Sequence, residues 1–387
     1  MYRILSLVVK NFMRNRVRTL LTVLGISVGV VAFAFLQTVL AAYSIGVEAS
    51  SPNRLVTRHR VSLFNLLPMS QFEKLQGVPG VTQVSYGLWF GGYYKDPKQF
   101  FGQFAVDNGY LDLYPEFVLK PEEKEAYNNE LQAAVVGRKL AKRFGWKLGD
   151  HVTITGTIFS GDWDFIIRGI YTGRERTTDE TAMFFHWKRV DERMRTVGRD
   201  SQVGWWLIGI ADPAVTGRVS SEIDDLFINS ASPTLTETEK DFQQSFVAMM
   251  GSIITIIRTA SWIVIGIILL VMANTMGMSA RERVTEYGVL KTLGFRATHL
   301  LTLIGGESLF VSFVGALVGC GIAFALIGVI GVGIEESMGQ IFPVFELTPM
   351  IMIQAIGLAM AAGLVACMVP AGRAVRLPIA NALRKVG

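Results

Sequence analysis

The chain has 387 residues, of which 50% are hydrophobic and only 18% are charged, and its mean hydropathy is +0.38. A soluble domain usually carries about 25% charged residues, so this composition excludes an ordinary soluble protein and indicates a membrane protein. The formal net charge of +5 has a meaning only once the positions of the basic residues are known.

Four apolar windows are long enough to span a bilayer, and they cover residues 20–43, 258–279, 301–333 and 349–372. A transmembrane helix needs about 20 consecutive apolar residues, and helices are expected because lipid does not tolerate an unpaired backbone. The third window would form roughly 50 Å of helix, so it must tilt, bend or project beyond the membrane. The first window is too long for the apolar core of a cleaved signal peptide, which has about 7–15 residues, and we expect it to be retained.

Basic residues gather in three short segments outside these windows, 1–19, 280–300 and 373–387, which together carry 13 Lys and Arg against 2 Asp and Glu. By contrast, residues 334–348 include three glutamates and no base, and residues 44–257 carry 23 bases and 26 acids. The positive-inside rule therefore places both termini and the 280–300 segment in the cytoplasm, and residues 44–257 outside. The positive charge is thus a topology signal, and no basic patch interleaved with aromatic residues indicates a nucleic-acid partner.

Residues 44–257 are expected to fold as a mixed α/β domain of two subdomains. A strand-like run, Arg54–Leu63, lies near the start, and an apolar strand, Gly204–Ala211, lies near the end, followed by a helix that Asp212 caps. Two such strand–helix units bracket the middle region, 95–200, which we predict to be an inserted subdomain. Both cysteines of the chain fall in predicted spans, so the domain must fold without disulfides, as its length permits.

The sequence lacks the motifs that mark phosphate-binding, metal-binding and catalytic sites. No G-x-x-x-x-G-K-[ST] phosphate-binding loop occurs, and the four histidines are too scattered for a metal site. The run GISVG at Gly25–Gly29 matches the nucleophile-elbow pattern. It lies in a predicted membrane helix, however, where the strand–turn–helix context of that motif cannot exist. We therefore predict no catalytic residue, no metal and no cofactor on this chain.

Small residues four positions apart in the predicted spans indicate close helix packing, because they let two backbones approach each other. This pattern predicts packing at Gly25, Gly29, Gly315, Gly319, Gly357 and Ala361. Glu307 lies two turns into the third span, where a lipid-facing carboxylate would be costly. We expect it to face protein in a packing or hydrogen-bonding role, since no second acid in the spans could relay a proton.

The segment 280–300 interrupts the apolar chain with charged, helix-forming residues. A helix from Ala280 to Gly294 has one apolar face, which consists of Val284, Tyr287, Leu290 and Leu293. An interfacial helix on anionic headgroups would explain the bases, but not the interleaved Glu282 and Glu286. We therefore favour a helix that docks onto a soluble partner and uses its apolar face for most of the attachment.

This segment closely resembles a known signature. RERVTEYGVLKTLGF follows the pattern R-E-R-x-x-E-I-G-[IV]-L-[RK]-[AT]-[LI]-G of the coupling helix in the MacB/FtsX-type permease family of ABC transporters, with a tyrosine in place of the usual isoleucine. VPAGRAVRLPIANALR, NRVRTLLTVLGISVGV and VVGRKLAKRFGWKLGDHVTITG resemble further motifs of the family. The ATPase-coupling positions that this resemblance implies are Arg281, Glu282, Arg283, Glu286, Tyr287, Leu290, Lys291, Leu293 and Gly294.

The resemblance implies four membrane helices with an outer domain between the first two, and a homodimer or pseudodimer bound to ATPase subunits that hold ATP and Mg²⁺. It also implies mechanotransmission, in which closure of the ATPases moves the coupling helices and the spans pass this motion to the outer domains. Because only 19 residues precede the first span, we expect the ATPase to be a separate chain. The expected location is the inner membrane of a bacterial cell.

Three functions fit such a family member. Efflux or secretion together with a periplasmic adaptor is the favoured one, and a permease that extracts lipoproteins or lipids is the second. The third is a regulator of an envelope enzyme that transports nothing. A regulator of this kind usually needs only a small outer domain, so the length of residues 44–257 counts against it.

Overall fold

The computed structural model describes residues 16–48, 51–249, 251–339 and 342–376. The chain divides into two compact units, which we call the helical unit and the α/β unit. The helical unit consists of Met1–Ala41, Ser252–Ile330 and Glu346–Gly387, and the α/β unit consists of Ala42–Gly251 and Gly331–Phe345. The α/β unit therefore includes a short segment that comes from a distant part of the sequence.

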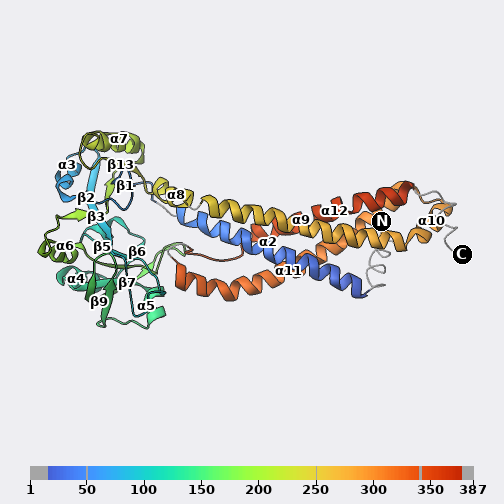
Figure 1. Ribbon diagram of the computed structural model, residues 1–387, viewed down its shortest axis with the longest axis horizontal. Helices are drawn as coiled ribbons and strands as arrows, with labels where there is room; N and C mark the ends of the chain where they lie inside the picture. The colour runs from blue at the N-terminus through green and yellow to red at the C-terminus, as the bar shows by residue number, and fades with distance from the viewer. Residues whose placement is uncertain (1–15, 49–50, 250, 340–341, 377–387) are drawn as a thin grey trace. The chain divides into compact units, whose positions relative to one another are not determined.

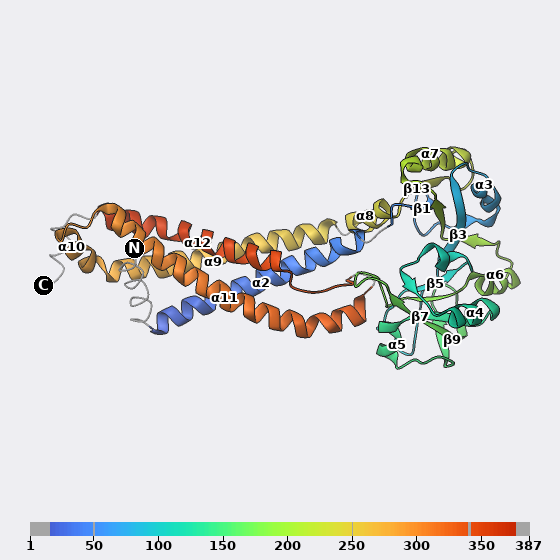
Figure 2. The same ribbon diagram turned by 180° about the vertical axis from the view of Figure 1, so that it is seen from behind.

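Four long helices are found among the described residues, and all four are long and apolar enough to cross a membrane. Figures 1 and 2 show them running side by side: α2 (Arg16–Glu48), α9 (Gly251–Glu282), α11 (Ala297–Met338) and α12 (Pro349–Arg376). Each helix contains one of the predicted apolar windows and extends beyond it at one or both ends. The extensions arise because neighbouring polar residues continue the helix, although they do not contribute to the apolar window.

Close packing of the helices in the helical unit depends on small residues. A Cβ atom added at Gly29 would lie 2.5 Å from a side-chain carbon of Ile268 on α9, and one at Gly25 would lie 3.2 Å from Val271. On α11, a Cβ at Gly315 would lie 2.9 Å from Ile26, and one at Gly319 would lie 2.7 Å from Val30. Small residues therefore bring α2 close to both α9 and α11, as expected for helices that associate without a hydrophobic driving force in lipid.

Hydroxyl groups add hydrogen bonds between these helices. Ser27 donates to the carbonyl of Gly315 at 2.9 Å, and Ser308 donates to the carbonyl of Gly363 at 2.7 Å. Both serines are buried. Each bond therefore satisfies a hydroxyl that lipid could not, at a position where a small residue has already brought the backbones together.

The predicted packing face of the fourth span differs from the one observed. Gly357 and Ala361 are exposed on the described chain, and a Cβ at Gly357 would meet no atom within 4 Å. The small residues that α12 buries instead are Ala355, Ala359, Ala362, Gly363 and Ala366. The sequence offers two stripes of small residues on roughly opposite sides of this helix, and only packing, such as that of Gly363 against Ser312 of α11, shows which one is buried.

The α/β unit is built on one mixed sheet of eleven strands among the described residues. Its order is β13 (Thr234–Thr238), β1 (Arg54–His59), β12 (Trp205–Ile210), β3 (Val81–Trp89), β5 (Gln103–Val106), β10 (Met183–His186), β7 (Ala133–Gly137), β9 (Gly161–Gly173), β8 (His151–Gly156) and β4 (Gly92–Tyr93), with β6 (Phe117–Val118) paired to β9. The β5–β10 and β7–β9 pairs are parallel, and the other pairs are antiparallel. A separate two-stranded sheet joins β2 (Leu67–Pro68) to β11 (Gln202–Val203).

Six short helices complete the α/β unit: α3 (Phe72–Gln76), α4 (Pro121–Asn129), α5 (Arg138–Phe144), α6 (Trp187–Thr196), α7 (Thr216–Phe227) and α8 (Glu239–Met249). The cap predicted at Asp212 is present, since its carboxylate accepts a hydrogen bond from the amide of Ala214 at 2.9 Å. A single 3-10 turn, Pro213–Val215, follows the cap before α7 begins.

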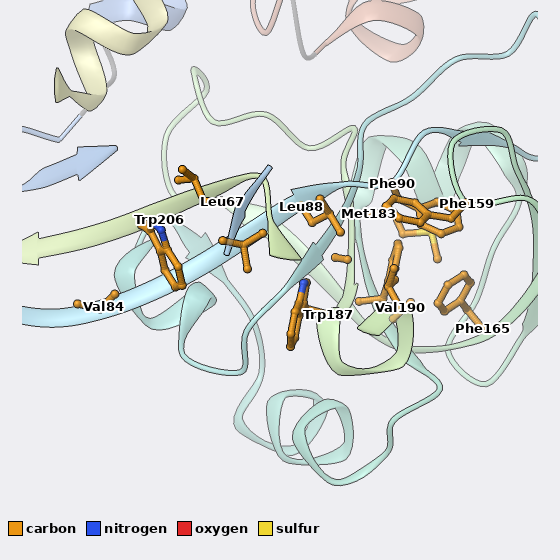
Figure 3. Close-up of a cluster of buried hydrophobic side chains, with 14 of the residues drawn as sticks. Leu67, Val84, Leu88, Phe90, Phe159, Phe165, Met183, Trp187, Val190 and Trp206 are labelled. Carbon is orange, nitrogen blue, oxygen red and sulfur yellow. The ribbon is translucent and has the colours of Figure 1, made fainter. Parts of the chain in front are cut away.

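The predicted inserted region occupies one half of this sheet. Strands from the two flanks, β13, β1, β12 and β3, are neighbours, and the strands of the insertion follow on the other side of β3. Gly87 of β3 pairs with both Trp205 and Val106, so the two halves share a strand. Figure 3 shows one apolar cluster that extends across this junction, from Trp206 on β12 to Phe165 on β9. A division into two subdomains therefore stays a prediction.

A buried ion-pair network joins the start and the end of the α/β sequence. The guanidinium of Arg54, at the start of β1, contacts Glu239 at 2.8 Å and Glu116 at 2.6 Å, and it also donates to the carbonyl of Leu113 at 2.8 Å. The side chains of Arg54 and Glu239 are 5% and 6% exposed. Burial alone would lower the pKa of Arg54, but the hydrogen bonds that it donates to Glu116 and the charge of Glu239 outweigh burial, so the pKa is raised and the charge is kept.

Replacement of Gly319 by leucine tests the packing of α2 against α11. The larger side chain has no room beside Val30 and the carbonyl of Ser27, so we expect Gly319→Leu to lower the stability of the helical unit by about 1–3 kcal/mol. Gly321→Leu on the same helix is the matched control, because a Cβ there meets nothing within 4 Å. Thermal unfolding of both variants in detergent measures the difference; equal stabilities would contradict this packing.

Replacement of Arg54 by methionine tests the buried network. The variant keeps much of the side-chain volume but leaves Glu239 buried without its cation, and such a loss costs about 3–5 kcal/mol. We expect the α/β unit to unfold at lower denaturant concentration, with the helical unit still inserted. Arg58→Met in the same strand removes a more exposed pair with Glu237 and should cost clearly less. An equal cost for both variants would show that the buried position of Arg54 has no special effect.

Candidate functional site

The predicted coupling segment forms a short helix, α10 (Val284–Thr292), between the end of α9 and the start of α11. Figures 1 and 2 show it at the end of the helical unit where these two long helices meet. Its N-cap, Arg283, leaves helical geometry with φ −100° and ψ 14°. Because of this break, Ala280, Arg281 and Glu282 belong to α9, where a single helix from 280 to 294 was predicted.

Gly294 ends α10 in the way its position in the sequence predicts. Its φ is +89°, in the left-handed region that glycine adopts without steric cost. Its amide donates to the carbonyl of Lys291 at 3.1 Å, and the amide of Phe295 donates to the carbonyl of Leu290 at 3.1 Å. These bonds satisfy carbonyls at the end of the helix and turn the chain toward α11.

One face of α10 packs inside the protein. Tyr287 is only 4% exposed, and it lies in an apolar cluster with Leu300 and Ile304 of α11 and Cys367 and Ala371 of α12. Burial raises the pKa of the Tyr287 phenol to about 12, so it is uncharged at neutral pH. Leu290 packs against the edge of the same cluster. The apolar face predicted to dock onto a partner thus lies partly against the chain's own helices.

Polar contacts fix α10 on the same side. Arg283 contacts the carboxylate of Glu307 on α11 at 2.7 Å, and both side chains are largely buried, at 11% and 12% exposure. Lys291 donates to the carbonyl of Val375 on α12 at 2.8 Å. Glu307 therefore faces protein, as its depth in the third span predicts. Since removal of one partner from a buried pair is costly, this pair holds α10 at a defined position on α11.

The other face of α10 and the turn after it are exposed. Val289 is 44% exposed, Leu293 is 71% exposed and Phe295 is 39% exposed. Arg281 and Glu282 lie near this face at the end of α9, and Glu282 is paired with Arg18 of α2 at 2.6 Å. We call Val289, Leu293 and Phe295 the outer apolar face.

The structure thus separates the predicted coupling residues into two groups. Arg283, Tyr287 and much of Leu290 face inward, where they hold the helix. Arg281, Glu282 and Leu293 face outward, and Glu286 and Lys291 are half-buried at the boundary. Val289 and Phe295 are exposed but are not among the coupling positions predicted from sequence. The spacing of four between positions 289 and 293 could have identified the second apolar stripe.

No metal centre is associated with this site: within the ranges that the structure describes, His, Cys, Asp and Glu residues form no group of three that could hold an ion. The exposed positions offer apolar contact and charge, whereas the buried positions offer attachment to the membrane helices. The arrangement is that of an exposed apolar surface on a helix whose other side is held by α11 and α12.

Two family comparisons together cover most of the chain. The MacB-like periplasmic core domain matches residues 19–226, and the FtsX-like permease C-terminal region matches residues 258–379. The second match includes most of α9 and all of α10, α11 and α12.

Similar proteins are found in bacteria and archaea. The chain is 25% identical to an uncharacterised ABC transporter permease of Methanocaldococcus jannaschii, over 87% of this chain and 86% of that protein. It is 24% identical to the pyoverdine export ATP-binding/permease protein PvdT of Pseudomonas fluorescens, over 95% of this chain but 57% of that protein. It is 31% identical to the macrolide export ATP-binding/permease protein MacB of Marinobacter nauticus, over 42% of this chain and 22% of that protein.

Two solved structures resemble part of the chain. The periplasmic region of MacB from Actinobacillus actinomycetemcomitans covers 52% of this chain and 95% of its own, with 13% identity and a TM-score of 0.39. The extracellular domain of the ABC-type transporter YknZ from Gram-positive bacteria covers 48% of this chain and 99% of its own, with 14% identity and a TM-score of 0.37.

Replacement of Tyr287 by alanine tests the inward attachment of α10. Loss of a buried aromatic side chain costs about 3–5 kcal/mol, so we expect the amides of α10 to exchange hydrogen at least about 100-fold faster. Tyr287→Phe keeps the ring and should retain most of the protection. Leu293→Ala, at an exposed position, is the control and should leave exchange unchanged. Unaltered exchange in Tyr287→Ala would mean that other contacts hold the helix.

Proposed function

Because this chain belongs to the family of ABC transporter permeases with a MacB-like periplasmic core domain and an FtsX-like permease region, we propose that it transmits the motion of a separate ATPase to its α/β unit and thereby drives efflux or secretion. The observation that supports this function best is the two-sided character of α10. One side is fixed to α11 and α12, and the other side presents exposed apolar residues.

The ATPase is proposed to be a separate chain that holds ATP and Mg²⁺. This sequence contains no phosphate-binding loop. The relatives printed as ATP-binding/permease proteins extend well beyond the region they share with it, since the chain spans only about 57% of PvdT. The protein itself would then hydrolyse nothing and would serve as the non-catalytic membrane subunit.

Force applied to α10 would reach the long helices through its inward contacts. The Arg283–Glu307 pair connects α10 to α11, and the Lys291–Val375 hydrogen bond connects it to α12. Tyr287 fills the space between both helices. Because these three contacts attach α10 to α11 and α12, displacement of the outer face of α10 would move all three helices together and would not detach α10.

Attachment of the ATPase would depend mainly on the outer apolar face. Burial of a large apolar side chain contributes about 1.5–3 kcal/mol, and Leu293 has most of its surface available. Arg281 and the half-buried Glu286 lie beside this face and would set the register of docking more than its strength, because charges at the rim of an interface are partly screened.

The orientation proposed for the protein follows the charge pattern, with both termini and α10 in the cytoplasm and the α/β unit outside the inner membrane. A second permease copy is proposed as a neighbour in the membrane. α9 supports this, since it exposes the large apolar side chains of Ile256, Trp262, Ile263, Ile267 and Leu270. These side chains must contact either lipid or another membrane helix.

Efflux is preferred over the two other functions. The relatives with printed substrates are exporters of pyoverdine and of macrolides, and a periplasmic adaptor would then complete the pathway across the envelope. Extraction of lipoproteins or lipids is the second candidate, because it would use the same motion of the α/β unit. Regulation of an envelope enzyme without transport is the least favoured, since it needs no outer domain of this size.

Charged substitutions on the outer apolar face test the docking of an ATPase. Val289→Asp combined with Leu293→Asp should lower the affinity for the ATPase by about 100-fold or more, because two apolar contacts are lost. α10 should stay in place, since neither side chain belongs to the inner cluster. The measurements are co-purification of the ATPase and ATP hydrolysis by the complex in lipid.

The matched control for this experiment is Val61→Asp. Val61 is 76% exposed, but it lies in the α/β unit, so a new charge there should leave the ATPase bound. Retention of the ATPase by the double variant, with hydrolysis and transport intact, would return α10 to the role of a helix that rests on lipid headgroups.

A further inference from the structure

The end of α11 and the segment after it form part of the α/β unit. Gly331–Phe345 group with this unit, although they come from the sequence between the third and fourth spans. They pack on α5, the short helix that carries Lys139, Lys142 and Arg143. Two of the three glutamates between positions 334 and 348, Glu335 and Glu336, are the acidic partners that this basic helix meets.

Four polar contacts join the two segments. Lys139 contacts Glu335 at 3.1 Å and donates to the carbonyl of Pro343 at 3.2 Å. Lys142 contacts Glu336 at 2.7 Å. Arg143 donates to the carbonyl of Ser337 at 3.2 Å. Since Ser337 lies in the last turn of α11, its carbonyl is at the negative end of the helix dipole, where a cation is favourable.

The segment is also fixed by contacts of its own. The second carboxylate oxygen of Glu335 accepts a hydrogen bond from the amide of Phe345 at 2.8 Å. The ring of Phe342 packs edge-to-face on Tyr43, with the centroids 4.9 Å apart. A Cβ at Gly339 would lie 2.6 Å from a methyl carbon of Thr181, so the backbone approaches the body of the α/β unit closely. The segment therefore has one defined position on this unit.

We propose that residues 331–345 and the three bases of α5 form a clasp through which α11 acts directly on the α/β unit. Besides the two ends of residues 331–345 themselves, the chain connects the long helices to this unit at two places, from α2 to β1 and from α8 to α9. The clasp adds a third connection, made by side chains, at a point in the sheet order far from β1 and β13, since α5 follows β7. This inference rests on the proposed function, because only a permease moved by an ATPase would use a third connection.

A third connection changes what the α/β unit can do. Two connections at neighbouring strands would let the unit pivot freely when the long helices move. A clasp on α5 would make the half of the sheet that carries β7 and β9 follow α11, while the half that carries β1 and β13 follows α2 and α9. Relative movement of the helices would then deform or tilt the sheet, which would otherwise keep its shape and orientation.

Charge reversal and charge exchange test the clasp. Lys142→Glu places like charges beside Glu336, and Glu336→Lys places a base beside Lys142. We expect each single variant to raise the hydrogen-exchange rate of residues 331–345 about tenfold, because a charge-assisted contact is lost. The exchanged pair, Lys142→Glu with Glu336→Lys, restores attraction and should return exchange to near the wild-type rate. The full-length protein with its ATPase, in lipid, is used throughout.

Coupling is measured on the same four proteins as transport per ATP hydrolysed. The single variants should bind the ATPase and hydrolyse ATP but lose transport several-fold, and the exchanged pair should regain it. Arg218→Glu is the matched control, because it breaks an equally exposed ion pair with Glu222 on α7, away from the clasp, and should alter neither measurement. Double-mutant behaviour of this kind is the evidence that a mechanical connection requires.

Three outcomes would overturn the proposal. Unchanged exchange in both single variants would show that no clasp forms, and faster exchange with full coupling would show that the clasp transmits nothing. Equal loss of coupling in Arg218→Glu would show a general effect of charge. Failure of the wild-type protein to bind an ATPase would overturn the proposed function and the coupling role with it, whereas hydrogen exchange would still report whether the clasp forms.

Discussion

One buried guanidinium joins the two ends of the main segment of the α/β unit, Ala42–Gly251. β1 follows α2, and β13 leads through Glu239 into α8 and α9; the two strands pair in the sheet, and Arg54 at the start of one is bonded to Glu239 at the end of the other. Ends that lie far apart in sequence are thereby held together without a disulfide. The paired strands β13 and β1 lie at one end of the sheet order, and the other strands follow from β1.

The same combination of an inward charge pair and an apolar contact recurs at α10. Arg283 and Glu307 hold the helix from one side, and Tyr287 fills the cluster beneath it. A short helix of nine residues is not stable by itself, so its position must come from these contacts. In the proposed function, the outer apolar face of α10 is the surface that contacts the partner. The proposed role in coupling depends on this division between a held face and a free face.

Much of the membrane part could be predicted from sequence, because apolar length and charge asymmetry are local properties. The windows around the four long helices, the turn at Gly294 and the inward position of Glu307 follow from such properties. The face of a helix is harder to predict. The sequence pattern assigns Tyr287 and Leu293 to one apolar face, yet one is 4% and the other 71% exposed. Similarly, Gly357 and Ala359 lie on opposite sides of α12, and only contact with another helix selects the buried one.

By itself, the sequence determined the composition-driven features of this protein: four apolar helices, a mixed α/β segment between the first two, and a charged helix whose pattern is that of a permease family. Tertiary structure alone decided which side of α10 is free, which small residues touch, and that residues 331–345 belong with α5. The physical reason is that hydrophobicity and charge are carried by each residue, whereas burial belongs to pairs of surfaces. Lys142 and Glu336 are 194 positions apart, and no local pattern connects them.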